Sequence, residues 1–219
     1  MRVRDYLGIG HRRQRQATRA MTLTMVGIFA IGVWTGDTGV IVNTAVGLAV
    51  TQLPPLLERD YGIALDPALT LWITTAVFLH ALGVLGLPGA EANFYAGIPW
   101  WDSVTHALSS SLVAAVGYTT VRALDRHSDA VHFPSRFVFV FILLFVLAFG
   151  VLWEVIEFAI GLAADSFGGE AVLTQYGLED TMMDLVFDTV GAVVVAVWGT
   201  AHLSDVVGHL EGWLDDRSH

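Results

Sequence analysis

Residues 137–164 form an apolar run that carries two carboxylates in its second half, Glu154 and Glu157. A run of this length can cross a bilayer, because about 20 helical residues span the hydrocarbon core. The two glutamates are three positions apart, so on a helix they lie about 60° from each other on one face. A charge at the centre of a membrane helix costs roughly 2.5–3.5 kcal/mol. No arginine or lysine follows Arg136 within this run, so we expect a bound cation to stabilise the pair.

The composition of the chain indicates an integral membrane protein with several spans. Of its 219 residues, 54% are hydrophobic and 15% are charged, and the mean hydropathy is +0.61. A soluble domain is less apolar than this. The chain contains no cysteine, which excludes disulfides and thiolate ligands. Its net charge of −10 argues against nucleic-acid binding, which requires a basic surface.

Hydropathy predicts an all-α fold, a polytopic integral membrane protein with six transmembrane helices in one bundle. The chain divides into an Arg-rich cytoplasmic tail at 1–17, a six-helix transmembrane domain at 18–203 and an amphipathic cytoplasmic tail at 204–219. A signal peptide is the alternative interpretation of the basic start, but no clear small-residue cleavage site follows it. The predicted spans are 18–35, 39–57, 69–87, 101–122, 135–164 and 180–203.

The arginines predict the orientation of the chain. Six of them precede residue 20, and the other five lie in or beside the segments 58–68, 123–134 and 204–219. These segments share one side of the membrane with the N-terminus, and the segments on the opposite side contain no arginine or lysine. The positive-inside rule therefore predicts the cell (cytoplasmic) membrane as the location, with both termini cytoplasmic.

Acidic residues and one histidine gather at the predicted outer ends of the last three spans. Asp102 and His106 are four positions apart and share a helix face. His80, on the third span, lies at a similar predicted depth. Three helices therefore bring polar faces to the outer third of the membrane. The candidate metal ligands are Asp102, His106, Glu154, Glu157, Asp180, Asp184 and Asp188.

The charge balance of this group predicts a metal site. Carboxylates packed together in a low dielectric cannot all stay ionised, so either several are protonated or cations neutralise them. An oxygen-rich set with one imidazole favours Mg, Mn or Fe(II), and a pair of ions is compatible with it. Zinc is less favoured, because it usually recruits more histidines. The expected cofactor is therefore a divalent metal ion.

Structural roles remain open for some of these residues. Asp102 and Asp180 stand at predicted helix starts, where aspartate is a preferred N-cap. His106 is compatible with a hydrogen-bonded histidine in the protein core. Asp188 is compatible with a hydrogen bond between helices. For these four residues the sequence leaves both interpretations open.

Other polar residues of the group lie inside predicted helices. Glu154, Glu157 and Asp184 are too far from helix starts to act as caps, which favours a functional role. The serines at 109–111 follow His106 on the same predicted helix. Small residues of this kind are typical of close helix packing, and a role as nucleophile is the less favoured alternative.

Three sequence motifs lie in order on the last three predicted spans. They are Trp101-Asp102 with His106, Ser109 and Ser110; Trp153-Glu154 with Glu157; and Asp180-Thr181-Met182 with Asp184, Leu185, Asp188 and Gly191-Ala192. These motifs resemble those of the YjdF-like family of small bacterial and archaeal inner-membrane proteins, and their order and spacing agree over roughly residues 95–195, almost half the chain. The resemblance implies a polytopic membrane protein from a family without an established activity. It therefore supports the site and leaves the reaction open.

Three classes of function fit such a site. The first is a metal-dependent enzyme that acts on a membrane lipid or another amphiphile, with Glu154 and Glu157 as the catalytic candidates for general base. The second is a proton- or divalent-cation-coupled transporter, which is disfavoured because 112–117, 138–148 and 190–201 contain no ionisable residue. The third is a structural or accessory protein. Diphosphate chemistry is disfavoured, because the outer side has no arginine or lysine to bind phosphate.

Overall fold

The computed structural model describes residues 10–86, 92–128, 130–168, 171–173 and 175–217. Within these ranges the regular structure is helical, as predicted, and an isolated bridge joins Gly86 to Asn93. The helices are α2 (His11–Thr35), α3 (Thr38–Val50), α4 (Leu53–Tyr61), α5 (Pro67–Gly83), α6 (Phe94–Gly97), α7 (Trp101–His127), α8 (Ser135–Phe167), α9 (Leu178–His202) and α10 (Ser204–Arg217).

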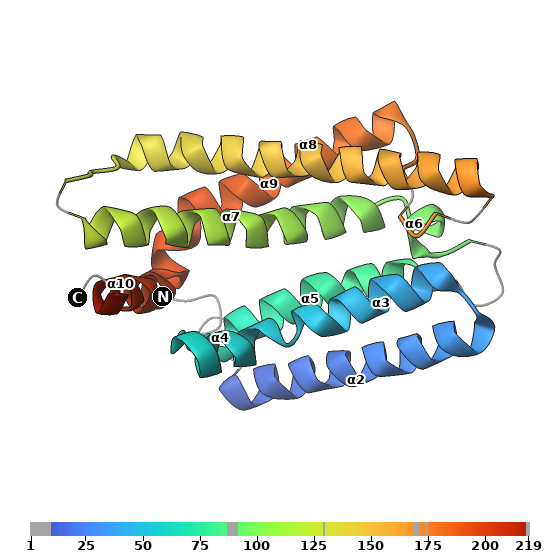
Figure 1. Cartoon of the computed structure of the whole chain (residues 1–219), viewed down its shortest axis with the longest axis horizontal. Coiled ribbons are helices and arrows are strands. Elements are labelled where there is room, and N and C mark those ends of the chain that lie inside the picture. The colour runs from blue at the N-terminus through green and yellow to red at the C-terminus, as the bar shows by residue number, and fades with distance from the viewer. Residues whose placement is uncertain (1–9, 87–91, 129, 169–170, 174, 218–219) are drawn as a thin grey trace.

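The long helices form two groups of three (Figure 1). Helices α2, α3 and α5 pack against one another, and helices α7, α8 and α9 do the same. Helix α5 packs against α7 and so joins the two groups, while α10 packs against α7 near the C-terminus of that helix. The predicted ligands all lie in the second group, on α7, α8 and α9.

Four helical segments are long and apolar enough to cross a membrane: His11–Thr35, Thr38–Tyr61, Ser135–Phe167 and Leu178–Gly199. They support a polytopic membrane protein. Helix α5 is apolar but has only 17 residues. Helix α7 has 27 residues and carries charged groups at both ends, which lowers its hydropathy. A bundle of six spans therefore stays a prediction.

Local sequence explains where the helices begin and end. Gly36 ends α2 with a φ of 74°, a conformation that glycine adopts without steric cost. Asp66 caps α5, because its carboxylate accepts the backbone N–H groups of Ala68 and Leu69. The predicted span at 39–57 is divided in the structure, since α3 ends at Val50 and α4 begins at Leu53. The prolines at 54 and 55 occupy the first turn of α4, where their missing N–H groups are tolerated.

Close packing of α7 against α9 positions the site. Gly191 of α9 faces the backbone oxygen of Ala107 and the hydroxyl of Ser110, so a methyl group at this position has no room. Beyond this contact, helices α7, α8 and α9 enclose an apolar core. Its buried members are Ala114, Tyr118, Val121, Val138, Ile142, Val146, Ala192, Val195, Leu203 and Val207. The outward face of α8 exposes Leu144, Val155 and Phe158, as is typical of a helix that contacts lipid.

Candidate functional site

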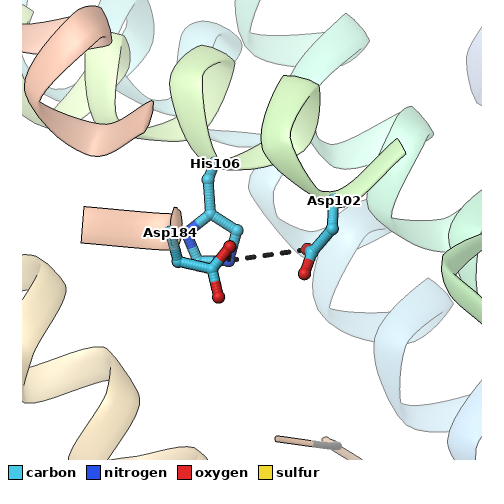
Figure 2. A group of neighbouring side chains, drawn as sticks. All are labelled: Asp102, His106 and Asp184. Atoms are coloured by element: carbon cyan, nitrogen blue, oxygen red, sulfur yellow. Dashed lines mark ion pairs between the residues drawn. The ribbon is translucent and has the colours of Figure 1, made fainter. Parts of the chain in front are cut away.

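Two aspartates and a histidine converge between α7 and α9 (Figure 2). Asp102 and His106 come from α7 and Asp184 from α9, and one ligand atom from each lies within 4.8 Å of the other two. The Nε2 atom of His106 is 3.6 Å from Asp102 Oδ1 and 3.7 Å from Asp184 Oδ1. Neighbouring ligands of an octahedral ion with bonds of about 2.1 Å lie about 3 Å apart. Small side-chain movements would therefore close the three groups around one ion.

The other ring nitrogen of His106 faces a third aspartate. Its Nδ1 atom lies 3.3 Å from Asp188 Oδ1. Gly150 of α8 faces this carboxylate and leaves space for it, because a methyl group there would collide with Asp188. A carboxylate on the second nitrogen fixes the orientation of a metal-binding imidazole and leaves its Nε2 free for the ion. In this geometry Asp188 orients His106, and its role as a direct ligand stays a prediction.

The two glutamates that interrupt the apolar run are buried and bonded to neutral donors. Glu154 Oε2 accepts hydrogen bonds from Thr181 Oγ1 at 2.8 Å and from Gln175 Nε2 at 3.4 Å. Glu157 Oε1 accepts one from Trp153 Nε1 at 2.9 Å. Both glutamates thus stand beside the Asp102–His106–Asp184 group without belonging to it. Their roles as metal ligands or as general base stay predictions.

Neither aspartate that stands near a helix start is the N-cap residue. The N-cap of α7 is Trp100 and that of α9 is Gly177. Asp180 is partly exposed, and its Oδ2 accepts the backbone N–H of Tyr176 at 3.0 Å. Asp180 therefore holds the loop before α9. Asp102 is turned toward His106, in the direction of the candidate metal centre.

The acids form one electrostatic group. The charges of Asp180 and Glu154 act on both Asp102 and Asp184, and the charge of His106 opposes them. No arginine lies close in sequence to any of them, and the chain has no lysine. The acids of the group lie within two stretches that contain no arginine, 60–121 and 137–216. One histidine cannot balance this many carboxylates, so the group has a net affinity for cations.

His106 also lines two adjoining cavities between the two groups of helices. The larger has a volume of about 220 Å³, and its apolar walls include Val46, Val77, Val113 and Phe149. The smaller, of about 60 Å³, carries the polar groups of Asp102, Glu157, Tyr95 and Tyr176. An engineered apolar cavity of about 150 Å³ holds benzene. The larger cavity therefore has room for a short apolar group next to the acidic cluster.

His80 lies on the wall that the two cavities share. Its ring nitrogens bond to the hydroxyls of Ser109 and Tyr95, whereas the sequence suggested that it joins the acids. Tyr95 of α6 was not predicted from the sequence, because nothing in its spacing connects it to this depth. Asn43 of α3 was not predicted either; it lines both cavities and donates to the backbone oxygen of Val172 at 2.8 Å. An amide within an apolar run was the available signal.

The fold and the site together define a helical, polytopic membrane protein with a buried cluster of acids around one histidine. The chain belongs to the family described as "Predicted membrane protein (DUF2238)", which matches residues 17–205. The resemblance to a family of uncharacterised membrane proteins is thereby confirmed.

A relative in Thermotoga maritima, described as "Uncharacterized protein", is 32% identical over 126 residues. The matched region spans 58% of this chain and 58% of that protein. No solved structure matches the chain. Neither the family description nor the relative's name states an activity, so the function has to be argued from the site.

Proposed function

We propose that the protein is a membrane enzyme with six spans. It binds a divalent cation near its outer face and uses this ion in a reaction on a lipid or another amphiphile. The observation that carries the proposal is the convergence of Asp102, His106 and Asp184, with one ligand atom of each within 4.8 Å of the others. Two carboxylates and an imidazole favour Mg, Mn or Fe(II), with zinc less favoured. Asp188 supports the same assignment, because it orients the imidazole.

The six-span arrangement is supported by the length of α7 and by the arginines. At 1.5 Å per residue the 27 residues of α7 extend for about 40 Å, which exceeds the hydrocarbon thickness. Asp102 and His106 of its first two turns lie against the acids of α9, which shelters them from lipid. The distribution of arginine predicts cytoplasmic termini in the cell membrane and a site on the outer side.

An enzyme fits the surroundings of the site better than a transporter does. A cation pathway requires polar groups on both sides of the site. On the inner side Ala114, Ile142 and Val146 are almost completely buried in an apolar core. An apolar cavity adjoins the acids on the side of Val113 and Phe149, as expected for a substrate with a hydrocarbon part. A bound cation would polarise the substrate or activate water there. Glu157 lines the smaller cavity together with Asp102 and His106, which supports it as the general base.

Elemental analysis of the purified, detergent-solubilised protein tests the cation site. After saturation with Mg, Mn, Fe(II) or Zn and removal of free ions, we expect about one ion per chain in the wild type. The variant Asp102→Asn/Asp184→Asn should retain almost none, because two of the three ligands lose their charge. Asp165→Asn is the matched control, since Asp165 is exposed near the C-terminal end of α8. The proposal would be contradicted by a wild type that retains no ion, or by a folded double variant that retains as much ion as the control.

The same analysis assigns the role of the two glutamates. If Glu154→Gln/Glu157→Gln loses the ion while it remains folded, the glutamates are ligands. If it keeps the ion, they are free for proton transfer, and their effect belongs to the reaction. Glu179→Gln serves as control, because Glu179 is exposed in the first turn of α9.

A further inference from the structure

A second group of reactive side chains lies beside the acidic cluster, on the wall of the larger cavity. The Nε2 atom of His80 is 2.9 Å from the hydroxyl of Ser109, and its Nδ1 atom is 2.6 Å from the hydroxyl of Tyr95. His80 comes from α5, Ser109 from α7 and Tyr95 from α6. An imidazole between two hydroxyls is the arrangement by which a serine is activated as a nucleophile, with the third group orienting the base.

The direction of these bonds depends on the tautomer of His80. Burial raises the pKa of Tyr95, so the phenol keeps its single proton. A phenol hydroxyl can donate this proton or accept another one, and a neutral imidazole donates from one ring nitrogen and accepts at the other.

In the tautomer that carries its proton on Nδ1, His80 donates to Tyr95. A neutral His80 then has a free lone pair on Nε2, and it accepts the proton of Ser109. This is the tautomer that a general base requires. Tyr95 is therefore a positioning residue, because it acts on Ser109 only by holding His80 in this state.

Ser109 differs from the two serines that follow it. Ser110 donates to the backbone oxygen of Ala107 at 3.2 Å, and Ser111 donates to that of Leu108. Such bonds within one helix satisfy a hydroxyl and leave it unreactive. Ser109 instead turns to a side chain of another helix. Ser110 also lines the larger cavity and so provides a matched control on the same wall.

We propose that Ser109 is a nucleophile that takes the acyl group of an ester with a short apolar part, with His80 as its general base. The apolar walls of the cavity, Val46, Val77, Val113 and Phe149 among them, would receive that part of the substrate. The proposal rests on the proposed function for the amphiphilic class of substrate. Its reactivity rests on the hydrogen bonds of Ser109 and requires no metal ion.

The reaction proceeds in two balanced steps. Oγ of Ser109 forms a bond to the carbonyl carbon, and its proton passes to Nε2 of His80. The bond from that carbon to the alcohol oxygen then breaks, and the alcohol leaves with the proton from Nε2. Water repeats the sequence on the acyl-serine, releases the carboxylic acid and restores the serine hydroxyl.

Labelling of the full-length protein in detergent with a short-chain alkyl fluorophosphonate tests the proposal. The serine oxygen bonds to phosphorus, fluoride leaves, and the proton goes to His80. Peptide mass spectrometry should locate the adduct on Ser109 in the wild type and in Ser110→Ala. Ser109→Ala should carry none. His80→Gln should react about 100-fold more slowly or worse, the smallest usual contribution of a general base.

Tyr95→Phe separates positioning from simple packing. It keeps the ring and removes the acceptor of the Nδ1–H, so Ser109 should still be labelled but at a reduced rate. A network with only a structural role would change the unfolding temperature without producing any labelling of Ser109 in the wild type.

The proposal is overturned if folded wild-type protein gives no Ser109 adduct with an excess of either the fluorophosphonate or a sulfonyl fluoride. It is also overturned if His80→Gln reacts as fast as the wild type, or if Ser110 is the labelled residue. The labelling is repeated in chelator. Loss of ion binding with intact labelling would reject the metal site alone, and intact ion binding without labelling would reject the nucleophile alone.

Discussion

The two ends of α7 arrange their charged groups in opposite ways. At its C-terminal end, the inner end in the predicted orientation, Arg122 lies 3.2 Å from Asp125, and His127 lies 2.5 Å from Asp215 of α10. At its N-terminal end, the outer end in that orientation, Asp102 and His106 meet further acids from α9. The inner charges are paired with opposite charges, whereas the outer charges are mostly of one sign.

This difference distinguishes a structural from a functional use of charge. Paired groups at the inner end tie α7 to α10 and to the loop at Phe133, whose N–H donates to Asp125 at 2.6 Å. These pairs neutralise each other and need no bound ion. The outer acids are buried and repel one another, which costs stability unless a cation binds. A cluster of acids that lowers the stability of the empty protein is typical of a binding site.

The largest expected effect concerns packing in the two halves of α7. In Gly191→Ala the new methyl group would collide with the backbone of α7 at Ala107, which cannot move alone. We expect a loss of about 1–3 kcal/mol or more in the free energy of unfolding. In Gly117→Ala the methyl group would lie 2.9 Å from a ring atom of Phe145. That ring can shift, and alanine favours the helix by about 1 kcal/mol, so the net change should be small. Denaturant unfolding measures both, and equal losses would show that the outer contact has no special tightness.

The next largest effect is the change in stability when a cation binds, which should involve the outer end of α7 and not the inner end. A cation at 100 times its dissociation constant should stabilise the folded wild type by about 2.7 kcal/mol. Asp184→Asn should lose this increment, because its carboxylate is one of the three convergent ligands. Arg126→Gln breaks an exposed pair with Glu211 at the inner end, so it should keep the increment and lower the baseline by at most about 1 kcal/mol. Thermal unfolding with and without the cation measures both, and an increment that survives in Asp184→Asn would contradict the comparison.

The smallest effect is the acid sensitivity of the inner end. The Phe133 N–H, followed by the Arg122 guanidinium, holds the pKa of Asp125 below its usual range. A lowered pKa in the folded state contributes stability that is present above about pH 4, the unfolded value, and is lost as the pH falls through the folded value. Asp125→Asn should lack this contribution, so its unfolding temperature should approach that of the wild type below about pH 4. A difference that stays constant from pH 7 to pH 3 would show that the Asp125 charge contributes nothing.

Much of the fold follows from sequence patterns that are local. The apolar run at 137–164 predicts α8 almost to its ends, because a long stretch without a helix breaker has one stable backbone conformation in lipid. The span predicted at 69–87 likewise overlaps α5, which begins at Pro67 after its cap Asp66. The division of 39–57 into two helices was missed, because hydropathy averages over the break at Thr51 and Gln52.

The sequence by itself determined that Asp102 and His106 share a helix face and that acids recur every four residues on α9, because helical periodicity is a local property. Only the tertiary structure decided that Asp184 reaches Nε2 of His106 and Asp188 reaches Nδ1. It also decided that His80 turns to Ser109 and Tyr95. These choices depend on how far α7 slides and rotates against α9 and α5. That register is set by close contacts such as Gly191 against Ala107, which no spacing along one helix can reveal.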